Sequence, residues 1–193
     1  MERLRRQLEF LLEIDKLKTV FRRNYLADGS RTENDAEHSW YFAIAALVLL
    51  DTAKEEVDTL RVLEIALIHD VVEVDAGDTF IYDEAAKQGQ AEREERAAQR
   101  LFGLLPKDQA RELLGLWHEF EAGRTPEARY ARAIDRVCAL ILNHASQGKA
   151  WREHGVTKDQ VVAINRRVAD GSPVLWAHVQ SLIEEAARRG DLS

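Results

Sequence analysis

The sequence predicts an all-α domain of about seven or eight helices. Through most of the chain, apolar residues recur at three- and four-residue intervals, which is the period of a helix that lies on a core. Residues that favour helix starts precede several of these segments. The 193 residues are 46% hydrophobic and include only 10 Gly and 3 Pro, a balance that fits one globular domain over residues 1–193 and excludes collagen-like or disordered chains. We find no strand, repeat or low-complexity segment.

The first predicted helix covers residues 2–18. Its apolar positions, spaced for one helix face among charged residues, are Leu4, Leu8, Leu11, Leu12, Ile14 and Leu17. This pattern predicts an amphipathic helix laid on a core. The polar stretch 22–33 follows and contains Asp28-Gly29-Ser30, three residue types that favour turns. We therefore expect a loop before the second helix.

The second and third predicted helices are strongly apolar. One begins at residue 34 or 35 and runs to about residue 54, with apolar side chains on most faces, so it should lie centrally. The other begins after Asp58, a residue type that caps helix N-termini, and covers residues 60 to about 74.

Two helices are predicted after the acidic loop 75–78. Residues 83–105 are rich in Glu, Arg, Ala and Gln at helix-supporting spacings, and their charges are typical of a solvated face. Pro106 ends this segment. Residues 108–122 then carry apolar side chains at helical spacing and predict the next helix.

The last helices are predicted from their first residues. Thr125-Pro126 and Ser172-Pro173 each place a hydroxyl cap before a proline at the first helical position, which predicts helices near 126–148 and 173–189. Thr157 and Gln160 form a capping-box pattern, so a further helix should lie between these two.

Charge and cysteine content narrow the class of protein. The sequence has 27 Lys and Arg against 34 Asp and Glu, a formal net charge of −7, which disfavours binding of polymeric nucleic acid. The longest apolar run, residues 40–50, is shorter than the roughly 20 residues of a membrane-spanning helix, and no signal peptide is visible. The single cysteine, Cys138, cannot form an internal disulfide, so we expect a reducing compartment, by default the cytoplasm.

Three ionisable residues interrupt the apolar segment 65–74. His69, Asp70 and Glu73 fall within about 100° of one another on a helical wheel, so all three can face one cleft. Burial of an unpaired carboxylate is costly, and a divalent cation would compensate it. A buried histidine that only hydrogen-bonds a carboxylate explains the pair alone about equally well.

Two other apolar helices carry similar interruptions. Glu37-His38 lies in the first turn of the second helix, and Asp135 interrupts the helix after Pro126. Two imidazoles and two carboxylates form a mixed nitrogen and oxygen set that suits Mn, Fe, Co, Ni or Zn better than Ca. No His-Glu-x-x-His motif is present, which argues against a metalloprotease.

With these residues the sequence resembles the HD-domain metal-dependent phosphohydrolases, whose signature is His, then His-Asp, then a distant Asp. It is most similar to the 5′-deoxynucleotidases of that superfamily, from about residue 8 to at least residue 135. The motifs that carry the resemblance are Leu17-Lys18-x-Val20-x-Arg22, Arg31-Thr32-Glu33-Asn34-x-x-Glu37-His38-Ser39 and His69-Asp70-x-x-Glu73-x-x-x-Gly77-Asp78.

The resemblance implies a metal ion held by His38, His69, Asp70 and Asp135. It places Glu73 and Asp78 beside the metal and Arg22 against the substrate phosphate. It also implies an all-α HD-domain bundle, with its motifs in about 17–145 and C-terminal helices in 146–193, and often a homodimer. We expect Mn, Co, Fe, Ni or Zn as cofactor, with Mg less favoured.

The expected reaction is hydrolysis of a phosphate monoester, most directly a (deoxy)nucleoside 5′-monophosphate. A bound metal activates water and polarises a phosphoryl oxygen, so no covalent nucleophile is required. Glu73 could orient or deprotonate the water and Asp78 assist the leaving alkoxide, or the two acids could exchange roles. The guanidinium of Arg22 suits a phosphate with several free oxygens. An ordinary surface arginine, an ion-paired Glu73 and a turn-capping Asp78 are the alternatives.

Two other functions stay open at this stage. One is an HD-type hydrolase of a nucleoside triphosphate, a cyclic nucleotide or guanosine tetraphosphate, and the other is a helical regulatory module without turnover. Two segments depart from the family pattern: loop 79–83, which lacks the expected proline, and the stretch of Asn143 and residues 148–155, which has no counterpart. Trp151 lies at a helical position that is more typical of a core than of a base-stacking platform.

Overall fold

The computed structural model describes residues 1–193 and confirms the all-α prediction. Eight α-helices have eight or more residues: α1 Glu2–Ile14, α2 Asp35–Val48, α3 Thr59–Ile68, α5 Gln90–Phe102, α6 Lys107–Ala122, α7 Pro126–Ala145, α9 Lys158–Asn165 and α11 Pro173–Arg189. The shorter elements are α4 Glu73–Ala76, α8 Lys149–Glu153, α10 Val168–Gly171, the 3-10 turns Asp15–Thr19 and Leu50–Thr52, and the strands β1 Phe21–Tyr25 and β2 Thr32–Asn34. None of the helices combines the length and apolar character that a membrane span requires.

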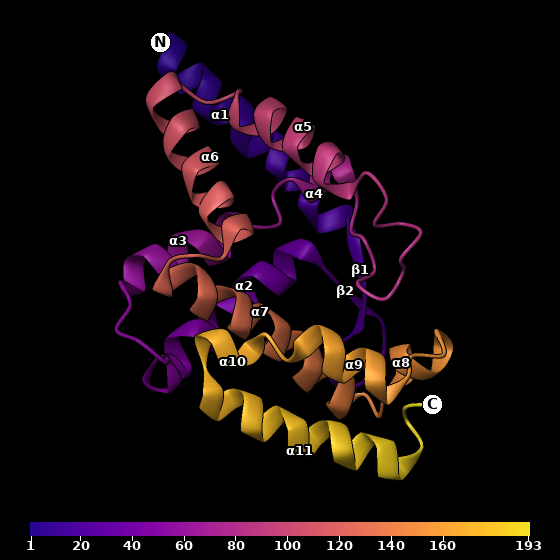
Figure 1. Cartoon of the computed structure of the whole chain (residues 1–193). Coiled ribbons are helices and arrows are strands. Elements are labelled where there is room, and N and C mark those ends of the chain that lie inside the picture. The colour runs from indigo at the N-terminus through magenta and orange to yellow at the C-terminus, as the bar shows by residue number, and fades with distance from the viewer.

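Helix α7 is the axis of the fold. It packs against α2, α3 and α6 on one side and against α10 and α11 on the other, while β1 and α8 contact its C-terminal half. Figure 1 shows α11 along one edge of the molecule and α1, α5 and α6 together at the opposite end. A helix with neighbours on all sides must be apolar over most of its surface, which makes each polar residue on it conspicuous.

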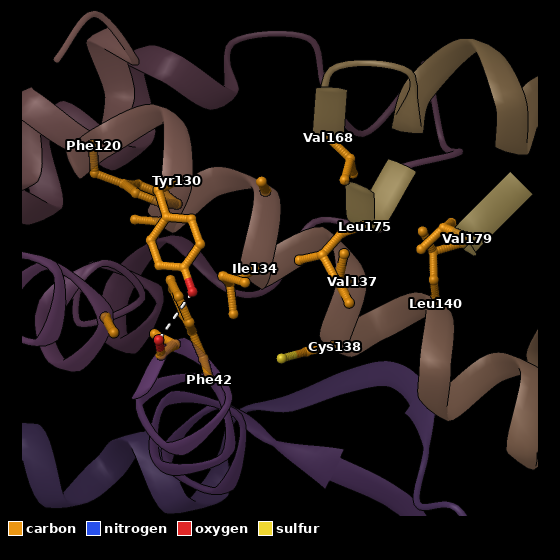
Figure 2. Close-up of a cluster of buried hydrophobic side chains, with 14 of the residues drawn as sticks. Phe42, Phe120, Tyr130, Ile134, Val137, Cys138, Leu140, Val168, Leu175 and Val179 are labelled. Atoms are coloured by element: carbon orange, nitrogen blue, oxygen red, sulfur yellow. Dashed lines mark hydrogen bonds between the residues drawn. The ribbon is translucent and has the colours of Figure 1, made fainter. Parts of the chain in front are cut away.

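The main core surrounds the buried face of α7. Its 24 buried residues include Phe42 from α2, Ile134 and Val137 from α7, and Val179 from α11. In this cluster the Tyr130 hydroxyl donates a hydrogen bond of 3.0 Å to the Ala46 carbonyl (Figure 2), so the polar tip of this side chain is satisfied. A second cluster of nine buried residues joins α1, α5 and α6.

The predicted helix starts are confirmed. The side chains of Asp58, Thr125, Thr157 and Ser172 accept hydrogen bonds from backbone N–H groups in the first turns of α3, α7, α9 and α11. Helix α11 covers residues 173–189, as the Ser172-Pro173 pair predicts. These signals act within one turn of the chain, and no tertiary contact is needed to produce them.

The prediction of no strand is wrong for residues 21–34. Strands β1 and β2 form an antiparallel pair in which Phe21 lies opposite Asn34 and Tyr25 opposite Thr32. The Asp28-Gly29-Ser30 turn is present between them, with the Asp28 carboxylate accepting from the Ser30 N–H and Gly29 at φ +70°. The strands are short and largely polar, and their pairing supplies stability that their sequence pattern does not reveal.

Several predicted helices are shorter than expected. The segment predicted as 60–74 breaks after Ile68, and α4 begins only at Glu73, because residues 69–72 form i to i+3 hydrogen bonds instead of a continuous helix. The helix predicted as 83–105 begins at Gln90. The helices predicted as 2–18, 34–54 and 126–148 end at residues 14, 48 and 145.

The leucine stripe of α1 does not face the core. Phe10 is the one buried residue of this helix, whereas Leu4, Leu8, Leu11 and Leu12 are exposed. The helix is amphipathic as predicted, but in the isolated chain its apolar stripe is turned outward.

Candidate metal centre

Three helices bring two imidazoles and a carboxylate together. His38 lies in the first turn of α2, which an Asn34–Glu37 capping box fixes in place. His69 caps the C-terminal end of α3, and Asp135 lies in the middle of α7. One ligand atom from each of His38, His69 and Asp135 lies within 4.8 Å of the other two. The structure thus places together three residues that lie up to 97 positions apart in the chain.

The tautomer of His69 is set by the backbone. Its Nδ1 lies 2.9 Å from the Ala66 carbonyl oxygen, which can only accept, so Nδ1 carries the proton. The other nitrogen, Nε2, is buried without a hydrogen-bond partner and lies 3.1 Å from Oδ2 of Asp70. When the ring is neutral, the lone pair of this nitrogen faces a carboxylate oxygen, a repulsive contact that either a second proton on the ring or a cation between the two atoms would remove.

His38 is fully buried between two acids. Its Nε2 lies 3.0 Å from Oδ1 of Asp135, and its Nδ1 lies 3.5 Å from Oε1 of Glu33. Burial lowers the pKa of His38, but the contacts with Asp135 and Glu33 outweigh burial and raise the pKa to about 9. Burial in turn opposes ionisation of Asp135, whereas its hydrogen bond to His38 holds the pKa of this carboxyl far below its usual range.

Asp70 joins the cluster from the turn after α3. Its Oδ2 lies 4.0 Å from Nε2 of His38 and 2.6 Å from Nη1 of Arg22. Burial raises the pKa of Asp70, but the charges of His69 and Arg22 reverse this effect and bring the pKa to about 2. Asp70 therefore lies beside both imidazoles, although it is not one of the three residues whose ligand atoms all lie within 4.8 Å of one another.

Arg22 comes from β1 and lies among carboxylates. Its guanidinium nitrogens approach the carboxylate oxygens of five residues within 4.0 Å: Glu33, Asp35, Asp70, Asp78 and Asp135. The side chain is 14% exposed, so the alternative of an ordinary surface arginine does not describe it. Five acids thus surround one guanidinium.

Glu73 and Asp78 line the same cavity. This open cavity of about 890 Å³ is bordered by Arg22, His69, Asp70, Glu73, Asp78 and Asp135. Oε2 of Glu73 is buried without a partner, and burial together with the charges of Asp70 and Asp78 raises the pKa of Glu73 to about 10. Burial also raises the pKa of Asp78. Neither acid is paired closely enough to a base to be a simple surface ion pair.

The residues present fit a divalent transition-metal ion. The unpartnered Nε2 of His69, the Nε2 of His38 and the oxygens of Asp70 and Asp135 form a mixed nitrogen and oxygen donor set. The Nδ1 of His69 already donates to a carbonyl, as metal-binding histidines commonly do. A cation would also offset the excess of buried acids.

Sequence reasoning missed two acids of this site. Glu33 and Asp35 are buried, and each lies 3.5 Å from Arg22. Burial and the charge of Asp70 raise the pKa of Asp35 to about 8. Glu33 belongs to a motif of the family resemblance and Asp35 falls on one of its unassigned positions, but their local sequence is typical of a loop and a helix start. A signal was present nevertheless: three acids in residues 33–37 exceed what one helix cap requires.

Comparison with known proteins gives a consistent result. A family model described as HD domain matches residues 14–176. The crystal structure of a "predicted metal-dependent phosphohydrolase" from Magnetospirillum magnetotacticum MS-1 is 50% identical, covers 100% of this chain and 96% of that one, and has a TM-score of 0.95. A conserved hypothetical protein from Pyrococcus furiosus shares the fold at a TM-score of 0.60 and 23% identity, over 94% of this chain and 99% of that one.

Curated relatives carry a more specific name. The human protein "5′-deoxynucleotidase HDDC2" is 32% identical over 136 residues, which are 70% of this chain and 65% of the human protein. The bovine protein of the same name is 33% identical over 139 residues, which are 72% of this chain and 66% of that protein. The chain thus spans slightly less than two thirds of the length of these relatives.

Proposed function

The chain belongs to the HD-domain family, and from this premise we propose that it hydrolyses a phosphate monoester and releases orthophosphate. The proposed substrate is a (deoxy)nucleoside 5′-monophosphate, in line with the names of the human and bovine relatives. The observation that carries the proposal is the group of His38, His69 and Asp135 within 4.8 Å, with Arg22 in contact with Asp70 beside it.

The proposed metal ligands are His38, His69, Asp70 and Asp135. Their donor set favours Mn, Co, Fe, Ni or Zn over Mg. When bound, such an ion polarises a phosphoryl oxygen and lowers the pKa of a coordinated water. Glu33 lies 3.5 Å from the Nδ1 of His38 and can accept its proton, which would orient the ring for ligation through Nε2.

The two acids of the cavity are proposed to handle protons. Burial and nearby carboxylates raise the pKa of Glu73, so the ionised form is a stronger base than an exposed glutamate. A bound cation beside it would favour this ionised form, which could then take a proton from the attacking water. Asp78 faces the same cavity with a raised pKa, and its acid form can protonate the departing alkoxide. The reverse assignment uses the same geometry.

Arg22 is proposed to bind the phosphate. A guanidinium presents parallel N–H donors, which match a terminal phosphate with several free oxygens better than a diester with fewer. Arg22 is held by the surrounding carboxylates at the border of the cavity, so a phosphate that enters beside Asp70 meets it without a large rearrangement. Its fixed charge can stabilise the negative charge that grows in the transition state.

The test is release of phosphate from a matched panel. Metal-stripped protein is loaded separately with Mn, Co, Ni, Zn or Mg and incubated with deoxy- and ribonucleoside 5′-monophosphates, triphosphates and cyclic nucleotides. Orthophosphate from monophosphates in the presence of a transition metal supports the proposal. Pyrophosphate from triphosphates would favour a different HD-type hydrolase, and tight nucleotide binding without any product would favour a regulatory module.

We also propose a homodimer, because two helices expose apolar faces. Leu4, Leu8, Leu11 and Leu12 of α1 are exposed, and so are Trp40, Ile44 and Leu47, which share one face of α2. Light scattering should give twice the chain mass of 22.0 kDa. Leu8→Glu and Ile44→Glu should reduce this value to that of a monomer, whereas the control Val174→Glu, at a more exposed apolar residue of α11, should not.

A cytoplasmic location is proposed on the chemistry of the one cysteine. Cys138 is buried in the main core, where burial raises the pKa of its thiol and no second thiol is present to form a bridge. An oxidising compartment would therefore not stabilise the chain through an internal disulfide. Fractionation of the source cells, with detection by a specific antibody, tests this location.

A further inference from the structure

A second cavity extends from the metal centre along α7. Its space of about 600 Å³ is partly open to solvent, and its lining begins at Arg22, Asp78 and Asp135 and reaches Asn143 and Trp151. Asp135 and Asn143 lie eight residues apart on one helix, which corresponds to roughly 12 Å at the usual rise. Strand β1 also borders this cavity, and its Asn24 donates to the Ala139 carbonyl of α7 at 3.1 Å. The cavity is thus long enough for a phosphate at one end and a further group at the other.

Three buried polar atoms of this cavity have no hydrogen-bond partner. They are Nε1 of Trp151, Oδ1 of Asn143 and Nη1 of Arg136. The Tyr82 hydroxyl lies close to the Trp151 side chain but does not complete a hydrogen bond of normal geometry with its N–H. Trp151 is 1% exposed and Asn143 is 6% exposed. The Nδ2 of Asn143 already donates to the Ala139 carbonyl at 3.0 Å, which leaves the amide oxygen free. Buried polar groups are nearly always hydrogen-bonded, so two unsatisfied donors and one acceptor in one cavity indicate a ligand.

Aromatic side chains form part of the cavity wall. Phe80 and Tyr82 border the cavity, with ring centroids 5.3 Å apart in an edge-to-face arrangement. The ring of His154 lies 4.6 Å from that of Phe80. The loop 79–83 and the segment 148–155, which both depart from the family pattern, therefore meet at the same cavity. The face of an aromatic ring beside hydrogen-bonding groups is suited to a planar heterocycle.

The far end of the cavity is fixed in place by the C-terminus. Arg152 forms an ion pair with Asp191 at 2.8 Å, and a Cβ on Gly148, which has φ +65°, would come within 2.5 Å of the Asp191 side chain. The Tyr25 hydroxyl donates to Glu153 at 2.9 Å. Helix α8 is thus held between β1 and the chain end, so Trp151 presents its N–H from a preformed position.

We infer that this cavity binds the base of a nucleoside 5′-monophosphate, with Trp151, Asn143 and Arg136 as its specificity-determining residues. The inference rests on the proposed function, since the phosphate must lie at the metal centre for the base to reach α8. A nucleobase carries both acceptors and N–H donors on a flat ring and so matches two donors, one acceptor and an aromatic wall. A sugar phosphate without a base would leave all three groups unpartnered.

The test compares two substrates that differ only in the base. Trp151→Phe keeps the ring and removes the N–H, and Asn143→Leu keeps the size and removes the acceptor. Both variants should lower kcat/KM for deoxynucleoside 5′-monophosphates about ten-fold or more, because an unpaired group then faces the base. Both should leave kcat/KM for 2-deoxyribose 5-phosphate within two-fold of wild type. The matched control, Trp117→Phe in the second core cluster, should leave both substrates unchanged.

The outcomes separate the inference from the proposed function. Equal losses on both substrates, or no loss on the nucleotide in either variant, overturn the inference while the hydrolase remains. If wild type binds a nucleotide but releases no phosphate, the proposed function fails, and the same comparison is made on Kd by calorimetry with metal-loaded protein. If wild type binds neither the nucleotide nor 2-deoxyribose 5-phosphate, the inference is overturned as well. Metal content and melting temperature of each variant identify any loss that comes from misfolding.

Discussion

The two faces of α7 differ in whether the buried polar groups beside them have hydrogen-bond partners. On the core face, the Tyr130 hydroxyl donates to the Ala46 carbonyl at 3.0 Å, and around it the packing is apolar (Figure 2). On the site face, Asp135 approaches His38 while the neighbouring groups Nε2 of His69, Oε2 of Glu73 and Oδ1 of Asn143 have no hydrogen-bond partner. One helix thus separates a region that is complete in itself from a region that is not.

This difference shows how a fold of this size can carry a reactive site. Unsatisfied buried groups destabilise the chain, and a ligand that binds only the folded state returns that free energy. The complete core supplies the stability that the site lacks. Substitutions on the core face should therefore change stability and leave chemistry intact, and substitutions on the site face should do the reverse.

The largest expected effect comes from Asp70→Ala. This change removes one proposed metal ligand and should lower phosphate release by a factor of roughly 1,000 or more, together with bound metal. The chain should stay folded, since Arg22 keeps four other carboxylates within 4.0 Å. Phosphate release, metal content by mass spectrometry and circular dichroism check this outcome. Full activity with Asp70→Ala would refute the proposed site.

Ile134→Ala tests the opposite face at a residue directly before Asp135. Ile134 is fully buried in the main core, so the cavity left by this substitution should lower the free energy of unfolding by about 2–5 kcal/mol. Below the melting transition, kcat and metal content should stay within two-fold of wild type. Urea unfolding measures the first effect. Loss of metal from the folded variant would show that the two faces are not independent.

Raising the pH should destabilise metal-stripped protein through its site acids. Burial raises the pKa of Asp35 to about 8 and that of Glu73 to about 10, so above pH 4.5 the folded chain holds protons that the unfolded chain has released. His38, with a pKa raised to about 9, acts in the same direction above pH 6.5. The free energy of unfolding should fall between pH 6 and 8.5, by at most about 1.4 kcal/mol per pH unit for each group.

Urea titrations at several pH values measure this dependence. Glu73→Gln should weaken it, because the amide does not titrate. The opposing contributions of Asp70 and Asp135, whose pKa values are lowered, lie in the acid range and do not enter this window. A free energy of unfolding that rises from pH 6 to 8.5 would contradict the assigned burial of the acids.

The smallest expected effect is that of Tyr130→Phe. The variant keeps the ring in the core and removes the hydroxyl, which leaves the Ala46 carbonyl without this donor and should cost about 1 kcal/mol. Activity should not change. Urea unfolding beside an activity assay checks both statements, and a loss of activity at full folding would show that the core face contributes to chemistry.

Local signals in the sequence predicted most of the fold. Helix starts at Asp58, Thr125, Thr157 and Ser172 depend on one turn of chain, and the structure confirms each of them. The β1–β2 pair depends on contact between segments, and so it was not predicted. The break after Ile68 was missed because the apolar period continues through it.

The residues of the candidate site also fall into two groups, those that the sequence predicts and those that depend on tertiary contacts. His38, His69, Asp70 and Asp135 could be predicted because polar residues in apolar helices are conspicuous and because their order resembles the family signature. Glu33 and Asp35 were not predicted as site residues, because their burial depends on the unpredicted hairpin that brings Arg22 to them. Trp151 fitted the pattern of a core residue, and it is buried, but only the tertiary structure shows that its N–H lines a cavity without a partner.

The most direct test of the account is a cobalt titration of metal-stripped wild-type protein. Visible absorption of the bound ion and phosphate release from a deoxynucleoside 5′-monophosphate are measured in the same samples. Absorption and phosphate release should rise together, saturate at one cobalt per chain and disappear on addition of a chelator. Phosphate release that does not depend on cobalt, or cobalt that binds at these ligands without any effect on release, would contradict it.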